Sequence, residues 1–122
     1  MNFDFDWWAI IITLLLILFD LVTGVVKALK TQSVSSKIMR EGLYHKSAFI
    51  LIVVLAVICE GALQHVDMTL NMPLVIPVCG FIVLTEIASS IENLAVINPE
   101  LTSSAILKLF ENIGDKGDSK NA

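Results

Sequence analysis

Residues 14–29 read LLLILFDLVTGVVKAL, an apolar run with a carboxylate, Asp20, inside it. The apolar segment around it covers residues 7–26, and a helix of that length spans about 30 Å, the thickness of a bilayer's hydrocarbon core. Trp7 and Trp8 stand at its start, where amphipathic rings favour the headgroup region. The stretch therefore predicts a membrane-spanning helix that carries an acid within it.

The composition agrees with a membrane protein. Hydrophobic residues make up 56% of the 122 residues and the mean hydropathy is +0.80, whereas soluble domains contain about 45–50% apolar residues even with glycine counted. The net charge is −4 and the sequence pI is about 4.9. Nucleic-acid binding rests on neutralising phosphates with basic residues, so we expect no nucleic-acid partner.

Nothing in the sequence predicts a metal site or a cofactor. The two cysteines, Cys59 and Cys79, lie singly within apolar segments, and His45 and His65 are far apart. We interpret the cysteines as small apolar side chains.

Two further apolar segments follow the first, at residues 48–63 and 73–91. A loose apolar stripe over residues 99–113 predicts a short amphipathic helix. The sequence therefore predicts an all-α membrane protein with three transmembrane helices and a short C-terminal amphipathic helix. We expect one transmembrane domain over residues 1–114 and a disordered polar tail over residues 115–122.

Several residues are typical of helix boundaries. Pro73 and Pro77 lie in the first turns of the third segment, where a missing N–H group costs least. Asn98 is a plausible N-cap for the C-terminal helix, with Pro99 at its first position and Gly114 after its end.

The connection between the first two segments is strongly basic. Five of the eight basic residues lie between Lys27 and Lys46. Short loops rich in lysine and arginine face the cytoplasm, so we expect the N-terminus outside and the C-terminus inside. Within this connection, Ser36–Leu43 is expected to form a brief helix ended by Gly42. The predicted cytoplasmic basic loop contains Lys30, Lys37, Arg40 and Lys46.

Each predicted span contains one acid: Asp20, Glu60 and Glu86. A charge at the bilayer centre costs about 2.5–3.5 kcal/mol on insertion scales. These carboxylates are therefore expected to face a protein interior, a partner chain or water. The topology places Asp20 and Glu86 in the same, cytoplasmic half of the membrane, with Lys27 as their expected cationic neighbour, and Glu60 toward the outer face.

Other polar residues share helix faces with these acids. Three interpretations remain open. The groups hold the three helices together, they line a water-filled interface in an oligomer, or they form a proton-coupled transporter site. The candidate oligomer or pore-lining stripe consists of Asp20, Thr23, Gly24, Lys27, Glu60, Glu86, Ser89, Ser90 and Asn93, with Thr13 on the same face of the first helix.

Catalytic functions are not supported. The serines, histidines and acids form no motif with nucleophile–base spacing, and there is no glycine-rich phosphate loop. We therefore expect no enzyme activity.

Three motifs resemble a known family. DLVTGVVKAL at residues 20–29 resembles the D-x-x-T-G-x-x-K-A signature of the toxin-secretion/phage-lysis holins. EGLYHKS at residues 41–47 resembles that family's Gly-Leu followed by a basic residue, and EIASSIENL at residues 86–94 resembles its E-x-x-S-I-x-E-N motif. Pro99 stands where the family tends to place a proline. The resemblance covers about residues 15 to 105.

The resemblance implies a function. Such holins are non-enzymatic proteins without cofactors that accumulate in the bacterial inner membrane. They oligomerise there into lesions that release a cytoplasmic endolysin or, in relatives, a toxin. The expected partners are therefore copies of the same chain, membrane lipid, and an endolysin or toxin as cargo. A non-lytic antiholin or regulatory membrane subunit, and a small ion channel, are the alternatives.

Overall fold

The computed structural model describes residues 3–66 and 72–100, together with Lys108 and Asn112, and the side chains from Asp6 onward. Most of the C-terminal helix predicted over residues 99–113 therefore lies outside the described residues.

The described chain forms three helices. Helix α1 spans Phe3–Lys30, α2 spans Ser36–Val66 and α3 spans Val75–Ile97. All three are long and apolar enough to cross a membrane. The prediction of an all-α membrane protein with three transmembrane helices is confirmed.

Helix α1 ends in a Schellman motif at its last lysine, Lys30. Gln32 has a φ of 53°, the left-handed conformation that lets the chain turn away from a helix. Ser33 N donates to Ala28 O over 3.0 Å, and Gln32 N donates to Leu29 O over 3.4 Å. These bonds satisfy carbonyls that a helix end leaves without partners, so the turn into α2 is tight.

Helix α2 begins much earlier than the predicted second span, residues 48–63. Ser35 caps it, because Ser35 Oγ accepts a hydrogen bond from Ile38 N over 3.1 Å. The helix then passes without interruption through Gly42, so the prediction of a brief helix ended by Gly42 is wrong. With 31 residues, α2 is about 46 Å long and exceeds the hydrocarbon core.

The predicted basic loop is also corrected by this early start. Only residues 31–35 connect α1 to α2. Lysine, arginine, methionine, leucine and glutamate all favour helices, and no proline interrupts the segment, so the helix continues through it. Lys30 is the last residue of α1, and Lys37, Arg40 and Lys46 belong to α2.

Helix α3 begins at Val75, so Pro77 lies in its first turn as predicted, whereas Pro73 lies before the helix and not in its first turn. Its N-cap position, Leu74, makes no side-chain cap hydrogen bond. At the other end Asn98 N donates to Leu94 O over 2.8 Å. The Asn98 side chain then accepts from Glu100 N over 3.2 Å, which is the capping contact expected of it.

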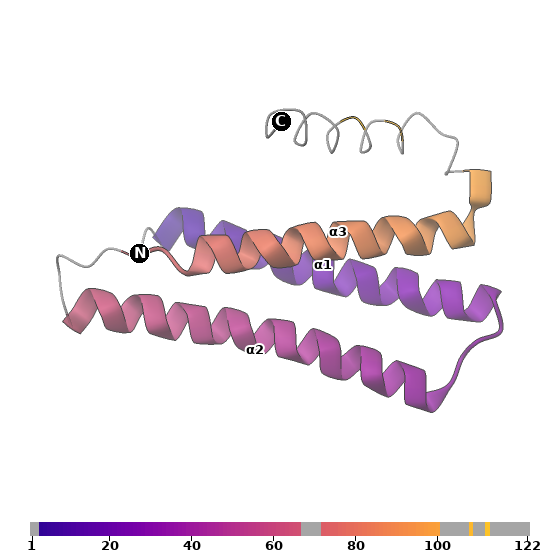
Figure 1. The fold of residues 1–122 in the computed structure, drawn as a ribbon, viewed down its shortest axis with the longest axis horizontal. Helices are drawn as coiled ribbons and strands as arrows, with labels where there is room; N and C mark the ends of the chain where they lie inside the picture. The colour runs from indigo at the N-terminus through magenta and orange to yellow at the C-terminus, as the bar shows by residue number, and fades with distance from the viewer. Residues whose placement is uncertain (1–2, 67–71, 101–107, 109–111, 113–122) are drawn as a thin grey trace, which may run out of the picture.

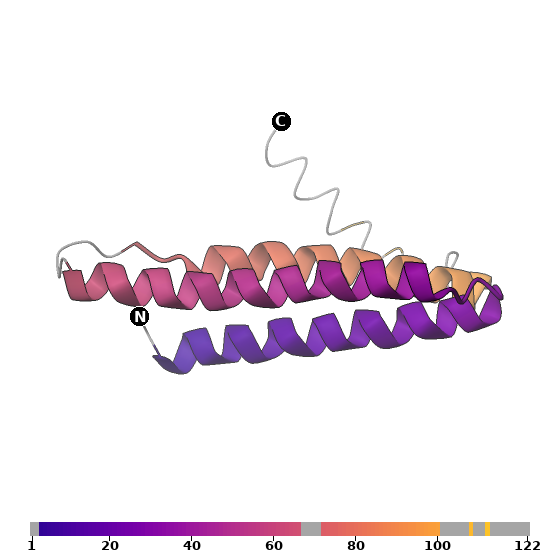
Figure 2. The same ribbon diagram turned by 90° about the horizontal axis from the view of Figure 1, so that it is seen from below.

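The three helices lie side by side along the long axis of the molecule, with α2 antiparallel to α1 and α3 (Figures 1 and 2). At the tryptophan end, the start of α1 with Trp7 and Trp8 meets the end of α2 and the start of α3. At the lysine end, the end of α1 with Lys27 and Lys30 meets the start of α2 and the end of α3. Helix α1 packs most extensively on α3, and α2 packs more sparsely on this pair.

The buried apolar core is small and lies between the helices. It consists of Ile10 and Ile17 of α1, Val53 and Ala56 of α2, and Val75, Cys79 and Ile82 of α3. Buried positions recur at alternating spacings of three and four residues, the pattern of helices that pack at a small angle. Polar residues occupy many positions of the same seam.

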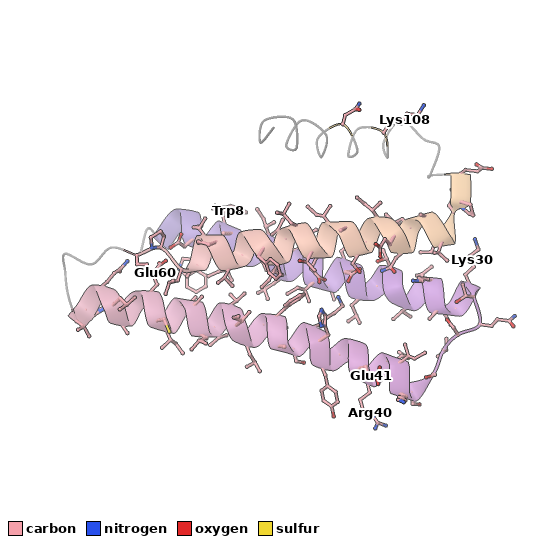
Figure 3. The ribbon with its side chains drawn as sticks, in the orientation of Figure 1. Trp8, Lys30, Arg40, Glu41, Glu60 and Lys108 are labelled. Carbon is pink, nitrogen blue, oxygen red and sulfur yellow. The ribbon has the colours of Figure 1, made fainter. Side chains whose placement is uncertain are left out.

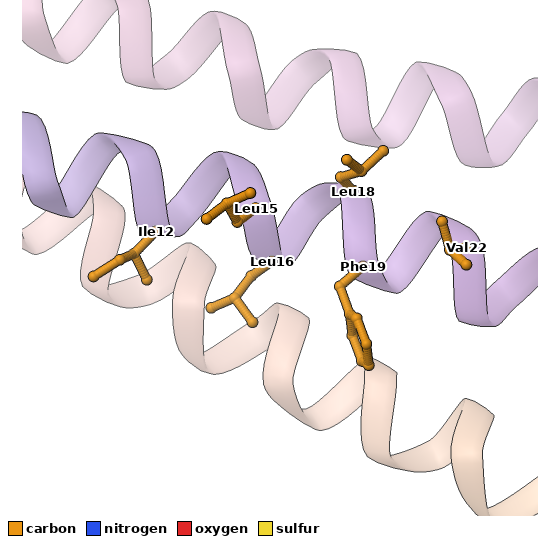
Figure 4. Close-up of a pocket in the computed structure, with 6 residues that line it drawn as sticks. All are labelled: Ile12, Leu15, Leu16, Leu18, Phe19 and Val22. Carbon is orange, nitrogen blue, oxygen red and sulfur yellow. The ribbon is translucent and has the colours of Figure 1, made fainter.

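The outer surface is apolar, as lipid contact requires. Figure 4 shows one stretch of it, where six α1 side chains form a shallow hollow of about 540 Å³. They are Ile12, Leu15, Leu16, Leu18, Phe19 and Val22. Similar large apolar side chains, including Leu51, Leu55, Phe81 and Leu84, are exposed on α2 and α3.

For the stability of the bundle, whether an apolar side chain is packed between helices should matter more than its apolar character. Ile82 is 0% exposed and Leu84 is 71% exposed. Lipid is as apolar as either side chain, so truncation matters only where it leaves a cavity. Ile82→Ala should lower the free energy of unfolding by about 2 kcal/mol, and Leu84→Ala should change it little. Steric trapping in bicelles measures the free energy of unfolding of both variants. Equal losses of stability would contradict the packing of Ile82 inside the bundle and of Leu84 on its surface.

Candidate functional site

The seam between α1 and α3 contains a line of buried polar side chains. Each is largely shielded from the surface, although the helices around it are apolar. From α1 come Thr13, Asp20 and Thr23, and from α3 come Glu86, Ser90 and Asn93. The predicted polar faces of the two helices therefore point toward each other.

A cluster of three charged residues, one from each helix, lies within this seam. Lys46 Nζ of α2 is 2.6 Å from Asp20 Oδ2 of α1 and 2.9 Å from Glu86 Oε2 of α3. One ammonium group thus donates to two carboxylates and links all three helices. In an interior of low dielectric such charge-assisted bonds are short and strong.

The second oxygen of Asp20 is also satisfied. Asn93 Nδ2 donates to Asp20 Oδ1 over 2.9 Å and to Thr23 Oγ1 over 3.1 Å. Ser90 Oγ lies 3.4 Å from the same Asp20 oxygen. Gly24 lies beside this group, and a Cβ there would make an ordinary van der Waals contact with Asn93 Nδ2 at 3.7 Å. Both carboxylate oxygens of Asp20 therefore accept hydrogen bonds from neighbouring helices.

The expected layer of Asp20 and Glu86 is present, but its cation is Lys46 and not Lys27. Within the described residues, the ion pairs of both acids are with Lys46, and Lys27 is half-buried farther along α1. Sequence reasoning placed Lys46 in a loop and so missed this role. A signal existed: positions 46 and 60 differ by 14, about four helical turns, so a continuous helix puts Lys46 on the face of Glu60.

Glu60 binds the start of α3 at the tryptophan end. Its Oε1 accepts hydrogen bonds from Leu74 N over 2.7 Å and from Val75 N over 3.2 Å. Figure 3 shows Glu60 at the end of α2, beside the first turn of α3. A carboxylate at this place satisfies free N–H groups and complements the helix dipole. This contact replaces the side-chain cap that Leu74 lacks.

Asp6 lies against Glu60 and was not recognised from the sequence as a site residue. Asp6 is 5% exposed, and its carboxyl group is within hydrogen-bonding reach of Glu60. The signal is a spacing of seven, since positions 6, 13 and 20 all fall on the buried seam of α1.

Lys30 binds the opposite end of α3. Its Nζ donates to Val96 O over 2.8 Å and to Ile97 O over 2.7 Å, and Figure 3 shows it beside the last turn of that helix. A cation at a helix C-terminus is favoured by the dipole. Helix α3 is thus held at its start by α2 and at its end by α1.

The remaining predicted residues lie near the lysine end. Ser89 lines a cavity of about 770 Å³ between α1 and the first half of α2, which reaches Asp20, Lys46 and Asn93. Lys37 and Arg40 are exposed on α2, and Arg40 points away from the bundle in Figure 3. These two residues therefore contribute positive charge to the surface and not to the seam.

The arrangement suits a membrane protein that conceals hydrophilic groups. A buried charge is tolerated only when it is paired and hydrogen-bonded, and the cluster of Lys46, Asp20 and Glu86 meets that condition in one bundle. In the described part of the chain, no group of three or more histidine, cysteine or acidic side chains is placed to hold a metal ion.

Comparison with known proteins identifies a family. The model of the bacteriophage holin family matches residues 2–115, nearly the whole chain. No curated protein and no solved structure matches the sequence.

Removing the charge of Lys46, which two acids share, should lower the free energy of unfolding much more than removing the charge of Lys27 on α1. Lys46→Met leaves two buried carboxylates without an ion partner and should lower the free energy of unfolding by about 3 kcal/mol. Lys27→Met removes the same charge outside the cluster and should cost far less. Steric trapping in bicelles compares the two.

A triple variant provides the control for this experiment. Replacing a whole buried ion group by neutral residues is often nearly neutral. Adding Asp20→Asn and Glu86→Gln to Lys46→Met should therefore restore much of the lost stability. If Lys46→Met and Lys27→Met were equally stable, the cluster would not hold the bundle together.

Proposed function

We propose that this chain, which belongs to the bacteriophage holin family, oligomerises in the bacterial cytoplasmic membrane and forms lesions that release an endolysin or a toxin from the cytoplasm. The observation that carries the proposal is the combination of an apolar outer surface with a line of buried polar side chains, interspersed with the apolar core, inside the bundle. The family match supports the class of function, and the seam supports the mechanism.

The closed bundle is compatible with lipid because its charges are neutralised internally. Leucine, isoleucine, valine and phenylalanine side chains cover the outside, while Lys46 joins Asp20 to Glu86 inside. Monomers in this form can accumulate without exposing polar groups to the hydrocarbon core. Each unsatisfied polar group exposed there would cost roughly several kcal/mol.

Helix α2 is the element whose displacement would open the seam. It packs more sparsely on α1 and α3 than these two pack on each other, and its buried residues are Val53, Ala56 and Glu60. If α2 moves aside, Lys46 leaves Asp20 and Glu86, and once α1 and α3 then separate, the polar faces that they turn toward each other become available to water and to other copies. At high density Asp20, Glu86 and Lys46 would exchange partners within the chain for partners between chains.

The polar stripe of the lesion would then be lined by residues of the seam. Asp20, Thr23 and Gly24 on α1 and Glu86, Ser90 and Asn93 on α3 are the central candidates, with Ser89 beside Ser90. Lys27 and Glu60 lie toward the two ends. Such a lining carries both signs of charge, which suits a hydrated lesion better than a filter for one ion.

The orientation follows from the distribution of basic residues. Lys27, Lys30, Lys37 and Arg40 all lie toward the lysine end of the bundle, and basic residues beside membrane spans favour the cytoplasm. We therefore propose that this end faces the cytoplasm, with the N-terminus outside and the C-terminus inside. The exposed cations would also attract anionic lipid.

Lysis with a reporter enzyme tests the function. The chain is induced in bacteria together with a cytosolic endolysin that lacks a secretion signal, while culture density and membrane potential are recorded. We expect a delay, then an abrupt loss of potential followed by clearing. Potential that declines in proportion to expression would indicate a small channel. Steady growth with the protein in the membrane would indicate a non-lytic subunit or antiholin.

The seam acids should set the length of the delay. In Asp20→Asn with Glu86→Gln, Lys46 loses both anionic partners, the closed bundle is weakened, and we expect an earlier onset of lysis and a changed oligomer size. Glu92→Gln removes an exposed acid from the same α3 and should leave both unchanged. Cross-linking in membranes reports oligomer size. An unaltered delay and oligomer in the double variant would refute the mechanism.

A further inference from the structure

We propose that Asp6 and Glu60 share one proton, with the Asp6 carboxyl group donating it to Glu60 Oε2. This pair is a proton-binding site that joins α1 to the end of α2 and the start of α3. It is separate from the cluster around Lys46, about four helical turns away along α1, and its existence does not depend on lesion formation.

The two oxygens of Glu60 have different surroundings. Oε1 accepts from Leu74 N and Val75 N, at 2.7 and 3.2 Å. Oε2 is buried and receives no hydrogen bond from the described residues. Glu60 is only 3% exposed, so Oε2 cannot turn to bulk water. A buried acceptor without a donor costs about 1–3 kcal/mol, and more when it is charged.

Asp6 is the neighbour that can supply the missing donor. Its carboxyl group lies within hydrogen-bonding reach of Glu60 and is itself buried. Two carboxylates offer only acceptors and repel each other, whereas a carboxylic acid beside a carboxylate has one O–H donor. Closely placed carboxyl groups in proteins do hold a single proton in this way. One proton therefore satisfies Oε2 and removes one negative charge.

Glu60 is better placed than Asp6 to carry the negative charge of the pair. The two backbone N–H groups at the start of α3 both point to Glu60 Oε1, and the helix dipole adds to their effect. The structure gives Asp6 no comparable backbone donors among the described residues. The proton is therefore assigned to Asp6.

No cation on the described helices replaces the proton. The nearest basic side chain on α2 is His65, whose Nδ1 bonds to Gly61 O over 2.8 Å at an exposed position. The first turns of α3 contribute backbone N–H groups and the buried Cys79. Lys46 is occupied by Asp20 and Glu86. Asp4 of α1 and the chain's amino group, which belongs to Met1, lie outside the described side chains.

The pair should hold the tryptophan end together only while the proton is present. Loss of the proton would leave two anions in contact between α1 and α2, both shielded from water. The first turns of α1 should then separate from Glu60, while Glu60 remains bonded to the start of α3.

Infrared spectroscopy of the full chain in lipid bilayers tests the proposal. The C=O stretch of a protonated carboxyl group is separate from that of a carboxylate, so the shared proton gives a distinct band at neutral pH. Asp6→Asn should abolish this band. Glu60→Gln should abolish it as well, because the glutamine amide donates to an ionised Asp6 and no proton is needed. Glu92→Gln, at an exposed position on α3, should leave it intact.

The Glu60→Gln variant distinguishes a proton shared by the two acids from a proton that Asp6 holds only because Asp6 is buried. If Asp6 held a proton only because it is buried, the band would disappear in Asp6→Asn but persist in Glu60→Gln, and the shared site would be wrong. The shared site would also be wrong if neither variant changed the spectrum. Selective ¹³C labelling of aspartate carboxyl groups in the unmutated protein should shift the band, which tests the assignment to Asp6 without a substitution. An unshifted band would place the proton elsewhere.

Discussion

The bundle depends on one ammonium group that serves two carboxylates. Lys46 Nζ lies 2.6 Å from Asp20 and 2.9 Å from Glu86, so a single side chain of α2 holds α1 and α3 at the same depth. Apolar contacts cannot do this alone in a membrane, because lipid competes equally well for leucine and isoleucine. Paired charges, which lipid cannot solvate, therefore set the register of the three helices.

Helix α3 depends on its neighbours at both ends. Glu60 of α2 accepts from its first N–H groups, and Lys30 of α1 donates to its last carbonyls. Each contact places a charge where the helix dipole favours it. Together with the central cluster, these contacts form three polar layers along the bundle. The sparse packing of α2 on α1 means that polar contacts carry much of the attachment of α2.

This design joins stability to a capacity for rearrangement. Polar groups that are satisfied within one chain can be satisfied equally by the same groups of another chain or by water, whereas a purely apolar seam has no such alternative. The lesion formation proposed above requires a chain that is harmless while it accumulates and that then exposes a hydrophilic surface. A bundle whose polar seam lies between α1 and α3, and whose least extensively packed helix α2 supplies the cation of that seam, fits both requirements.

The sequence alone determined the membrane class, the number of membrane-spanning helices and the faces that carry polar residues. Apolar segments long enough to cross a bilayer have few other folds available to them. Helical spacing places Asp20 with Thr23, and Glu86 with Ser90 and Asn93, whatever the neighbours are. The motifs at Asp20, Glu41 and Glu86 also pointed to the family that the match over residues 2–115 shows.

Only the tertiary structure decided which charges meet. The basic segment before the second span was predicted as a cytoplasmic loop with a brief helix in it, yet it is the start of α2. That continuity brings Lys46 and not Lys27 to the acids. Likewise, the pairing of Asp6 with Glu60 joins residues far apart in the chain. Hydropathy reports how each segment meets lipid, but the depth and rotation at which helices pack arise from contacts between them, and no single segment contains that information.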